Sequence, residues 1–158
     1  MRIFKEHFVL LTISALLFSA GLPLQTGASE AYRNPAVPGQ DSPQYWMDRG
    51  GLYATYGNYP AAIKAYQKAL DLNVRGGTVY YDLSLAYSEN GEFDQALAAI
   101  DKALTMAPDN GRFWYGRGWI LLRSGTSPET ARVNIEKAAA LGYPDALAYL
   151  RREAHVAK

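Results

Sequence analysis

The sequence predicts an all-α fold, in which helical hairpins repeat along the chain and form a solenoid. Within residues 77–110, apolar side chains recur at positions i, i+3, i+4 and i+7, which is the spacing of one helix face. Gly91 interrupts this segment and Pro108 ends it, so its 34 residues contain two helices. The same pattern is found one period earlier and one period later. Because one hairpin cannot bury its apolar side alone, we expect neighbouring hairpins to stack.

The first repeat, residues 43–76, begins at a helix-capping signal. Asp41 or Ser42 can accept a hydrogen bond from the first turn through its side-chain oxygen, and Pro43 suits that turn because the amide it lacks would have no partner there. Pro60 is expected to start the second helix of this repeat for the same reason. The repeat therefore reads as a helix, a short turn and a second helix.

Two adjacent glycines lie inside the first of these helices. Each is expected to weaken it by roughly 1 kcal/mol relative to alanine. Gly50 occupies a position that is small in every repeat, so close helix packing explains it. The pattern offers no such reason for Gly51.

The second and third repeats, residues 77–110 and 111–143, keep small residues at the matching positions, with one extra residue in the turn of the third repeat. The paired small positions are Gly50 with Ala62, Ser84 with Ala96, and Gly118 with Ala131. Two helices approach closely only where small residues face large ones. A large side chain at Ala96 should therefore destabilise the fold by about 1–3 kcal/mol through overpacking.

A last helix is predicted at residues 144–155. Ala146, Leu147 and Leu150 are expected to face the third repeat, while charged residues face water. Repeat arrays need an end of this kind, because an uncapped array would expose an apolar face.

This register of large, small and aromatic positions resembles the tetratricopeptide repeat, which has the same period. The resemblance extends over about residues 43–141 and implies a right-handed α-α superhelix of three repeats and a capping helix, within a domain at 43–158. It also implies a protein–protein interaction module whose concave groove holds a partner segment. Residues 138–146 are similar to the boundary of a Sel1-like repeat, a related helical solenoid, which would not change the architecture.

The resemblance further implies that one stripe of the first helices lines this groove. Its candidate partner-binding residues are Met47, Tyr81, Leu85, Arg112, Tyr115, Trp119 and Arg123. Aromatic residues and arginine are the usual anchors of binding surfaces, and the two arginines are expected to add positive charge at one end of the groove. Three alternatives stay open: Tyr81 and Leu85 can equally pack one repeat on the next, the leader at residues 29–42 can cover the stripe, and the arginines can equally be solvated charges.

One known groove pattern can be tested on the sequence. Family members that hold the acidic C-terminal tails of cytosolic chaperones resemble one another in a clamp of lysine and asparagine residues. The corresponding positions here are Met47, Gly51, Asp82, Arg112 and Gly116. Only Arg112 fits, so we do not expect that ligand.

No residue pattern indicates catalysis, a metal site or a cofactor. The chain has no cysteine, which excludes thiolate chemistry and disulfides, and His155 is the only histidine beyond the N-terminal 28 residues. A formal net charge of +1 with interspersed signs argues against nucleic acid as a partner. We therefore expect a protein or peptide partner, no cofactor and no enzymatic activity.

Residues 1–28 have the features of a secretory signal. A basic start precedes an apolar run at residues 8–20, which is shorter than the ~20 residues that span a membrane. We expect cleavage and export to a bacterial periplasm; an uncleaved anchor formed by residues 8–24 is the alternative. Residues 29–42, with two prolines and a glycine, are expected to form a flexible leader.

Together these features favour an adaptor or assembly factor for a bacterial envelope complex. Self-association into a homo-oligomer is a second interpretation, because short repeat arrays can pair through exposed apolar faces. A structural spacer is a third. An envelope hydrolase would need a group that titrates near neutral pH in the folded part, and the sequence supplies none.

Overall fold

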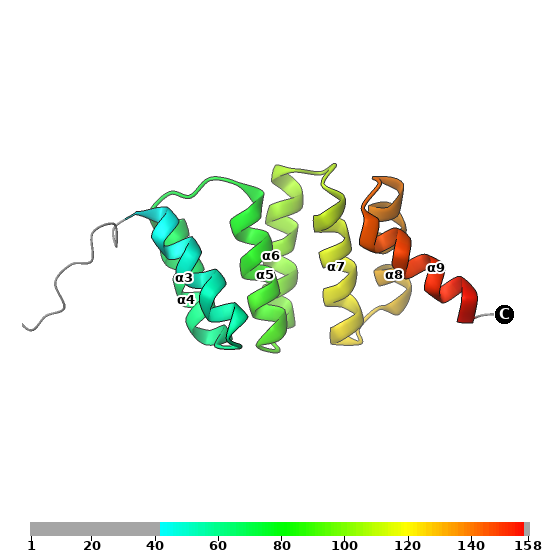
Figure 1. The fold of residues 1–158 in the computed structure, drawn as a ribbon, viewed down its shortest axis with the longest axis horizontal. Helices are drawn as coiled ribbons and strands as arrows, with labels where there is room; N and C mark the ends of the chain where they lie inside the picture. Colours follow the sequence, from blue (N-terminus) through cyan, green and yellow to red (C-terminus); the bar gives the residue numbers. More distant parts are fainter. Residues whose placement is uncertain (1–41, 157–158) are drawn as a thin grey trace, which may run out of the picture. The chain divides into compact units, whose positions relative to one another are not determined.

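The computed structural model describes residues 42–156, and the predicted signal and nearly all of the predicted leader lie outside them. The described residues form the helices α3 (Pro43–Thr55), α4 (Tyr59–Asp71), α5 (Gly77–Glu89), α6 (Phe93–Met106), α7 (Gly111–Ser124), α8 (Pro128–Ala140) and α9 (Pro144–Val156) (Figure 1). This part of the chain contains no strand. The all-α prediction is confirmed.

The helices form antiparallel pairs, α3 with α4, α5 with α6, and α7 with α8, and each pair packs on the next. The first helices also meet across the repeats, since α5 contacts both α3 and α7. Ala62, Ala96 and Ala131 are 0% exposed, as the repeat pattern predicts. At Gly118 an added Cβ would lie only 2.7 Å from Cγ1 of Ile135, so this position has to be small.

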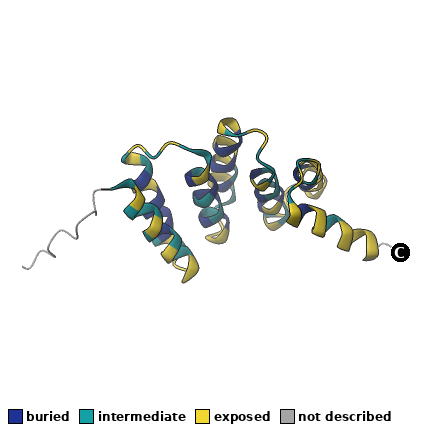
Figure 2. Ribbon diagram, turned by 45° about the horizontal axis from the view of Figure 1, so that its top comes forward, coloured by how far each residue is buried: buried dark blue, intermediate teal, exposed yellow. Residues whose placement is uncertain are grey.

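The core lies both within the helical pairs and between successive pairs. A first cluster joins Tyr66 of α4 to Leu83 of α5, and a second joins Ile100 of α6 to Phe113 of α7. Figure 2 shows the buried faces of the helices turned toward their neighbours. Each repeat therefore depends on the adjacent one for its stability.

The helix ends follow the local signals in the sequence. The Ser42 hydroxyl accepts a hydrogen bond from the Tyr45 amide at 3.1 Å and caps α3. Gly91 has φ of +82°, the left-handed conformation that ends a helix at little cost for glycine. Both features confirm the predicted helix boundaries.

The C-terminal helix α9 packs on α8 and leaves much of its surface exposed (Figure 2). Ala146 is 0% exposed and Leu150 is half-buried against the cluster that includes Ile135. Leu147 is 37% exposed, so the prediction that it faces the third repeat is wrong. Leu147 lies one residue, or about 100° of helix rotation, from Ala146, which points straight at α8.

Candidate functional site

The first helices of the three repeats border a hollow of about 490 Å³. Its lining residues belong to α3, α4, α5 and α7. They are Gly51, Ala54, Tyr59, Tyr66, Asp82, Leu85, Ala86, Glu89 and Trp119. Its wall is mostly apolar or aromatic, and its charged members are two carboxylates. Concave surfaces with a few convergent polar groups are the usual form of binding sites.

One face of α5 supplies the central wall of this hollow. Asp82, Leu85, Ala86 and Glu89 are spaced i, i+3, i+4 and i+7, so they project from the same side of the helix. Trp119 of α7 follows Leu85 by one period of 34 residues and comes to the same hollow from the next repeat. The repeat register thus brings equivalent positions of neighbouring hairpins together.

The floor of the hollow is open at Gly51. A Cβ added there would have the Tyr66 hydroxyl oxygen as its nearest neighbour, at 3.9 Å, which is an ordinary van der Waals distance. A Cβ added at Gly50 would overlap the Tyr66 ring. Close packing therefore requires glycine at position 50, as predicted, but not at position 51.

Asp82 has an unusual electrostatic environment in this wall. Burial raises the pKa of its carboxyl above the ordinary value, and the Arg112 guanidinium offsets part of that rise. Burial and the nearby charge of Asp82 also raise the pKa of the Tyr66 hydroxyl to about 12. No ion pair involving Asp82 occurs among residues 42–156. Its negative charge is therefore only partly compensated.

The second carboxylate of the hollow has a partner. Glu89 forms an ion pair with Arg123, one repeat further along the chain, and thereby links the C-terminal ends of α5 and α7. Both side chains are about one third exposed, so the pair is expected to contribute only a few tenths of a kcal/mol. Arg123 is thus partly neutralised at the rim of the hollow.

The structure places two of the predicted binding residues, Leu85 and Trp119, together in the wall of this hollow. Leu85 is half-buried, and Trp119 is 41% exposed. A tryptophan has the largest apolar surface of any side chain, and burying it would be favourable. Its exposure here makes it the clearest candidate for contact with a partner.

The structure places Tyr81 in the core. It is 6% exposed, and its ring stacks on that of Phe113 at a centroid distance of 5.2 Å. The Arg112 guanidinium covers the ring at 4.5 Å from its centroid. Tyr81 therefore performs the packing role that the sequence left as its alternative, and its binding role stays a prediction with little free surface to support it.

Met47 and Tyr115 are half-buried and do not line the hollow. Met47 packs against the first core cluster, and Tyr115 lies against Tyr143 at a ring-centroid distance of 5.4 Å. Arg112 and Arg123 lie at opposite ends of α7, so the expectation that both add charge at one end of the groove is wrong. Eleven residues of helix separate them by about 16 Å.

Gly51 and Asp82 were considered from sequence only as positions of a clamp that this chain does not match, and neither was predicted to bind a partner. Gly51, Ala54 and Asp82 carry no chemical motif, and nothing in their residue types indicated a site. The i, i+3, i+7 spacing of Asp82, Leu85 and Glu89 is the one signal that could have grouped them.

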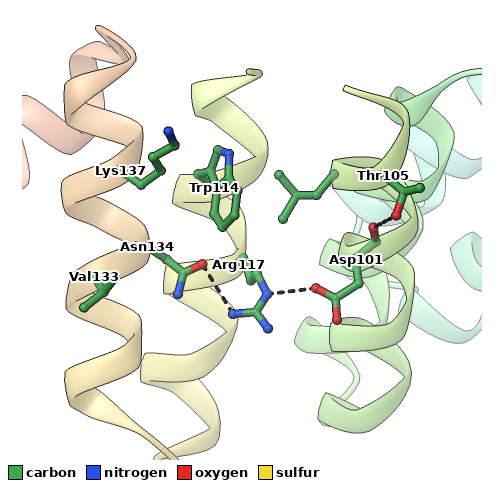
Figure 3. A pocket seen from close by; sticks show the side chains of 8 residues that line it. Asp101, Thr105, Trp114, Arg117, Val133, Asn134 and Lys137 are labelled. Atoms are coloured by element: carbon green, nitrogen blue, oxygen red, sulfur yellow. Dashed lines mark hydrogen bonds and ion pairs between the residues drawn. The ribbon is translucent and has the colours of Figure 1, made fainter. Parts of the chain in front are cut away.

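A separate hollow of about 680 Å³ lies between α6, α7 and α8 (Figure 3). The Arg117 Nε donates to Asp101 Oδ1 at 2.8 Å, and its Nη1 donates to Asn134 Oδ1 at 3.3 Å. Asn134 is buried and donates in turn to the Thr130 carbonyl at 2.6 Å. These contacts hold three helices together, which gives Arg117 a structural role.

Trp119 also borders a third hollow, of about 830 Å³, which faces α9. Its other lining residues include Tyr149 and Leu150 of α9 together with Arg132 of α8. The exposed tryptophan therefore stands between two concave surfaces. An extended ligand could contact both.

The described part of the chain has neither a metal-binding cluster nor a membrane-spanning helix. Residues 42–156 contain no group of three or more histidine, cysteine or acidic side chains placed to hold a metal ion. None of the helices α3–α9 is both long enough and apolar enough to cross a membrane.

Comparison with protein families gives matches to two models, both described as tetratricopeptide repeat. One matches residues 43–73 and the other residues 81–142, which together exceed half of the chain. A curated relative, the photosystem I assembly protein Ycf3 of Synechococcus, is 30% identical over 122 residues, covering 75% of this chain and 63% of that protein. The chain spans only 10–21% of the length of four other curated relatives.

Solved structures show the same fold at low identity. The first tetratricopeptide domain of Spaghetti (RPAP3), bound to the HSP90 peptide SRMEEVD, has a TM-score of 0.63 and 20% identity, and the match covers 74% of this chain and 94% of that one. PcrH in complex with the chaperone-binding region of PopB has a TM-score of 0.62 and 19% identity, covering 70% and 92%. These similarities concern the fold alone.

Proposed function

This chain belongs to the tetratricopeptide repeat family and is a protein–protein interaction scaffold, and from this premise we propose that it is an adaptor or assembly factor for a bacterial envelope complex. It holds a segment of a partner protein against α5 and α7, where Trp119 is exposed. The observation that carries this proposal is the position of Trp119, between two hollows of about 490 and 830 Å³. Exposed aromatic residues beside concave surfaces are frequent anchors of protein interfaces.

The proteins that share this fold support the role of holding a segment. The RPAP3 domain is bound to a peptide, and PcrH is bound to a region of PopB. The Synechococcus relative is an assembly protein by name. Members of the family are generally interaction modules, and we extend this to the present chain by proposing no catalytic role for it.

The envelope location rests on the N-terminal sequence. Residues 1–28 carry the basic start and short apolar run of a secretory signal, which supports export to the periplasm. An uncleaved anchor at residues 8–24 would also place the repeats in the envelope. Comparing the mass of the exported chain with that of the full chain distinguishes cleavage from anchoring.

The proposed role can be tested with Trp119→Ala, because this side chain is exposed and its removal leaves the core intact. A partner is first crosslinked to the parent chain in the native envelope and identified by mass spectrometry. Trp119→Ala, alone and combined with Tyr115→Ala, should lower capture of that partner at least about tenfold, the loss of one interface anchor. Helicity by circular dichroism should stay unchanged.

Val133→Ala is the matched control, because Val133 is exposed on α8 and borders a different hollow. It should leave capture as it is in the parent chain. Equal capture by the parent chain and by both Trp119 variants would contradict the assignment of this surface.

Self-association is the second candidate. Leu52 and Tyr56 are exposed in the first hairpin, and Leu147 is exposed on the last helix. Exposed apolar residues at the two ends of an array can join one copy to the next. Sedimentation of the purified chain over a wide concentration range tests this candidate, and a monomer at every concentration would remove it.

A further inference from the structure

We propose that the hollow of about 490 Å³ beside Trp119 receives a basic side chain, lysine or arginine, of the partner segment. This inference rests on the proposed function and deepens it, since it names the chemistry of the segment. It is built on three properties of the wall: its charge, its aromatic groups and the space at Gly51.

The charge of the wall is negative. Asp82 and Glu89 line the hollow, and no basic side chain is among the residues that line it. Glu89 is already paired with Arg123 at the rim, whereas Asp82 has no ion pair among residues 42–156. A cation that enters the hollow would supply the partner that Asp82 lacks, and an acidic segment would be repelled.

The electrostatics of Asp82 agree with this. Burial raises the pKa of its carboxyl, and the charge of Arg112, whose guanidinium lies over the Tyr81 ring, offsets only part of that rise. The Tyr66 hydroxyl is the other titratable group close to Asp82, and its raised pKa of about 12 keeps it neutral. A cation bound in the hollow would therefore stabilise the charge of the partly buried Asp82 carboxylate.

The aromatic groups favour a cation as well. Trp119 and Tyr59 line the hollow together with Tyr66. A lysine ammonium or arginine guanidinium over an aromatic face gains about 0.5–2 kcal/mol, depending on how far it is desolvated. Leu85 and Ala54 offer apolar surface to the aliphatic stem of such a side chain.

Gly51 provides the space. A Cβ there would have nothing nearer than the Tyr66 hydroxyl oxygen at 3.9 Å, so the fold could accommodate alanine. The glycine nonetheless remains in the middle of α3, where it weakens the helix. The space that Gly51 leaves for an incoming side chain explains why glycine occurs here, since neither the repeat pattern nor the packing requires it.

The test uses three fluorescein-labelled peptides, Ala-Leu-Ala-Xaa-Ala-Leu-Ala, in which Xaa is arginine, citrulline or glutamate. Citrulline has the shape of arginine without its charge. We expect the arginine peptide to bind about tenfold more tightly than the citrulline peptide by fluorescence anisotropy at low salt, and the glutamate peptide to bind most weakly.

Two variants separate charge from space. Asp82→Asn keeps the size of the side chain and should make the difference between the arginine and citrulline peptides several-fold smaller, because only the aromatic groups and Glu89 then still favour the charge. Gly51→Leu fills the hollow and should abolish binding of all three peptides. Val133→Ala should behave as the parent chain, and thermal unfolding verifies that each variant is folded.

Equal affinity of the parent chain for the arginine and citrulline peptides would overturn the inference, as would failure of the parent chain to bind any of the three. An arginine–citrulline difference as large in Asp82→Asn as in the parent chain would overturn it too. None of these results touches the proposed function, whose own test is capture of the envelope partner by the Trp119 variants. If the proposed function is wrong, the capture experiment will show it, whatever the ranking of the three peptides.

Discussion

Replacing Gly50 by alanine and, separately, Gly51 by alanine should change stability in opposite directions, although the two residues are neighbours on α3. An added Cβ at Gly50 would overlap the ring of Tyr66, which is buried and cannot move aside easily. An added Cβ at Gly51 meets the Tyr66 hydroxyl oxygen at an ordinary contact distance of 3.9 Å. The pair therefore compares the same chemical change with and without a clash.

The magnitudes follow from two opposing effects. Alanine in place of glycine stabilises a helix interior by about 1 kcal/mol, and this gain applies at both positions. Overpacking a buried contact costs about 1–3 kcal/mol, and this loss applies only to Gly50→Ala. Gly51→Ala should therefore be about 1 kcal/mol more stable than the parent chain. Gly50→Ala should be less stable than Gly51→Ala by about 1–3 kcal/mol, because the helix gain cancels in the comparison.

Thermal unfolding followed by circular dichroism at 222 nm measures the difference. For a folded part of this size, 1 kcal/mol corresponds to about 4 °C in Tm, so the two variants should differ by about 4–12 °C. Urea unfolding of the same samples gives the free energies directly. If the two variants unfold at the same temperature, Tyr66 does not fill the space beside Gly50 and the packing of the first hairpin described above is incorrect.

Two further predictions concern the charge in the hollow and the core between the repeats. Since the folded-state pKa of Asp82 is raised, the native state binds more protons than the unfolded state above about pH 4, and the free energy of unfolding should fall as pH rises through that window. In Asp82→Asn this part of the pH dependence should disappear. If the parent chain and Asp82→Asn show the same dependence of urea unfolding on pH from acid to neutral, burial does not raise the pKa of the Asp82 carboxyl. Phe113→Ala removes a buried ring that stacks on Tyr81 and should lower the free energy of unfolding by about 3–5 kcal/mol in urea, whereas a loss below about 1 kcal/mol would mean that these rings do not join the second and third repeats.

The groove residues show where reasoning from sequence stops. Leu85 and Trp119 are equivalent positions of adjacent repeats, yet Leu85 is half-buried and Trp119 is 41% exposed. The difference arises because α5 packs against α7, whereas α9 packs chiefly against α8 and leaves the surface of α7 open. Tyr81, on the same predicted stripe, is buried because Phe113 of the next repeat covers it.

The spacing of residues along the chain was sufficient to predict the helices, their pairing and their period, because helix faces, proline starts and glycine ends depend on neighbours within a few turns. Gly91 and the buried Ala96 follow from that local pattern alone. Only the tertiary structure decided which stripe residues remain free, that Asp82 faces a hollow and forms no ion pair within residues 42–156, and that Gly51 opens its floor. These properties depend on how far one hairpin covers the next, which is set by contacts between side chains of different repeats, such as that of Tyr81 with Phe113.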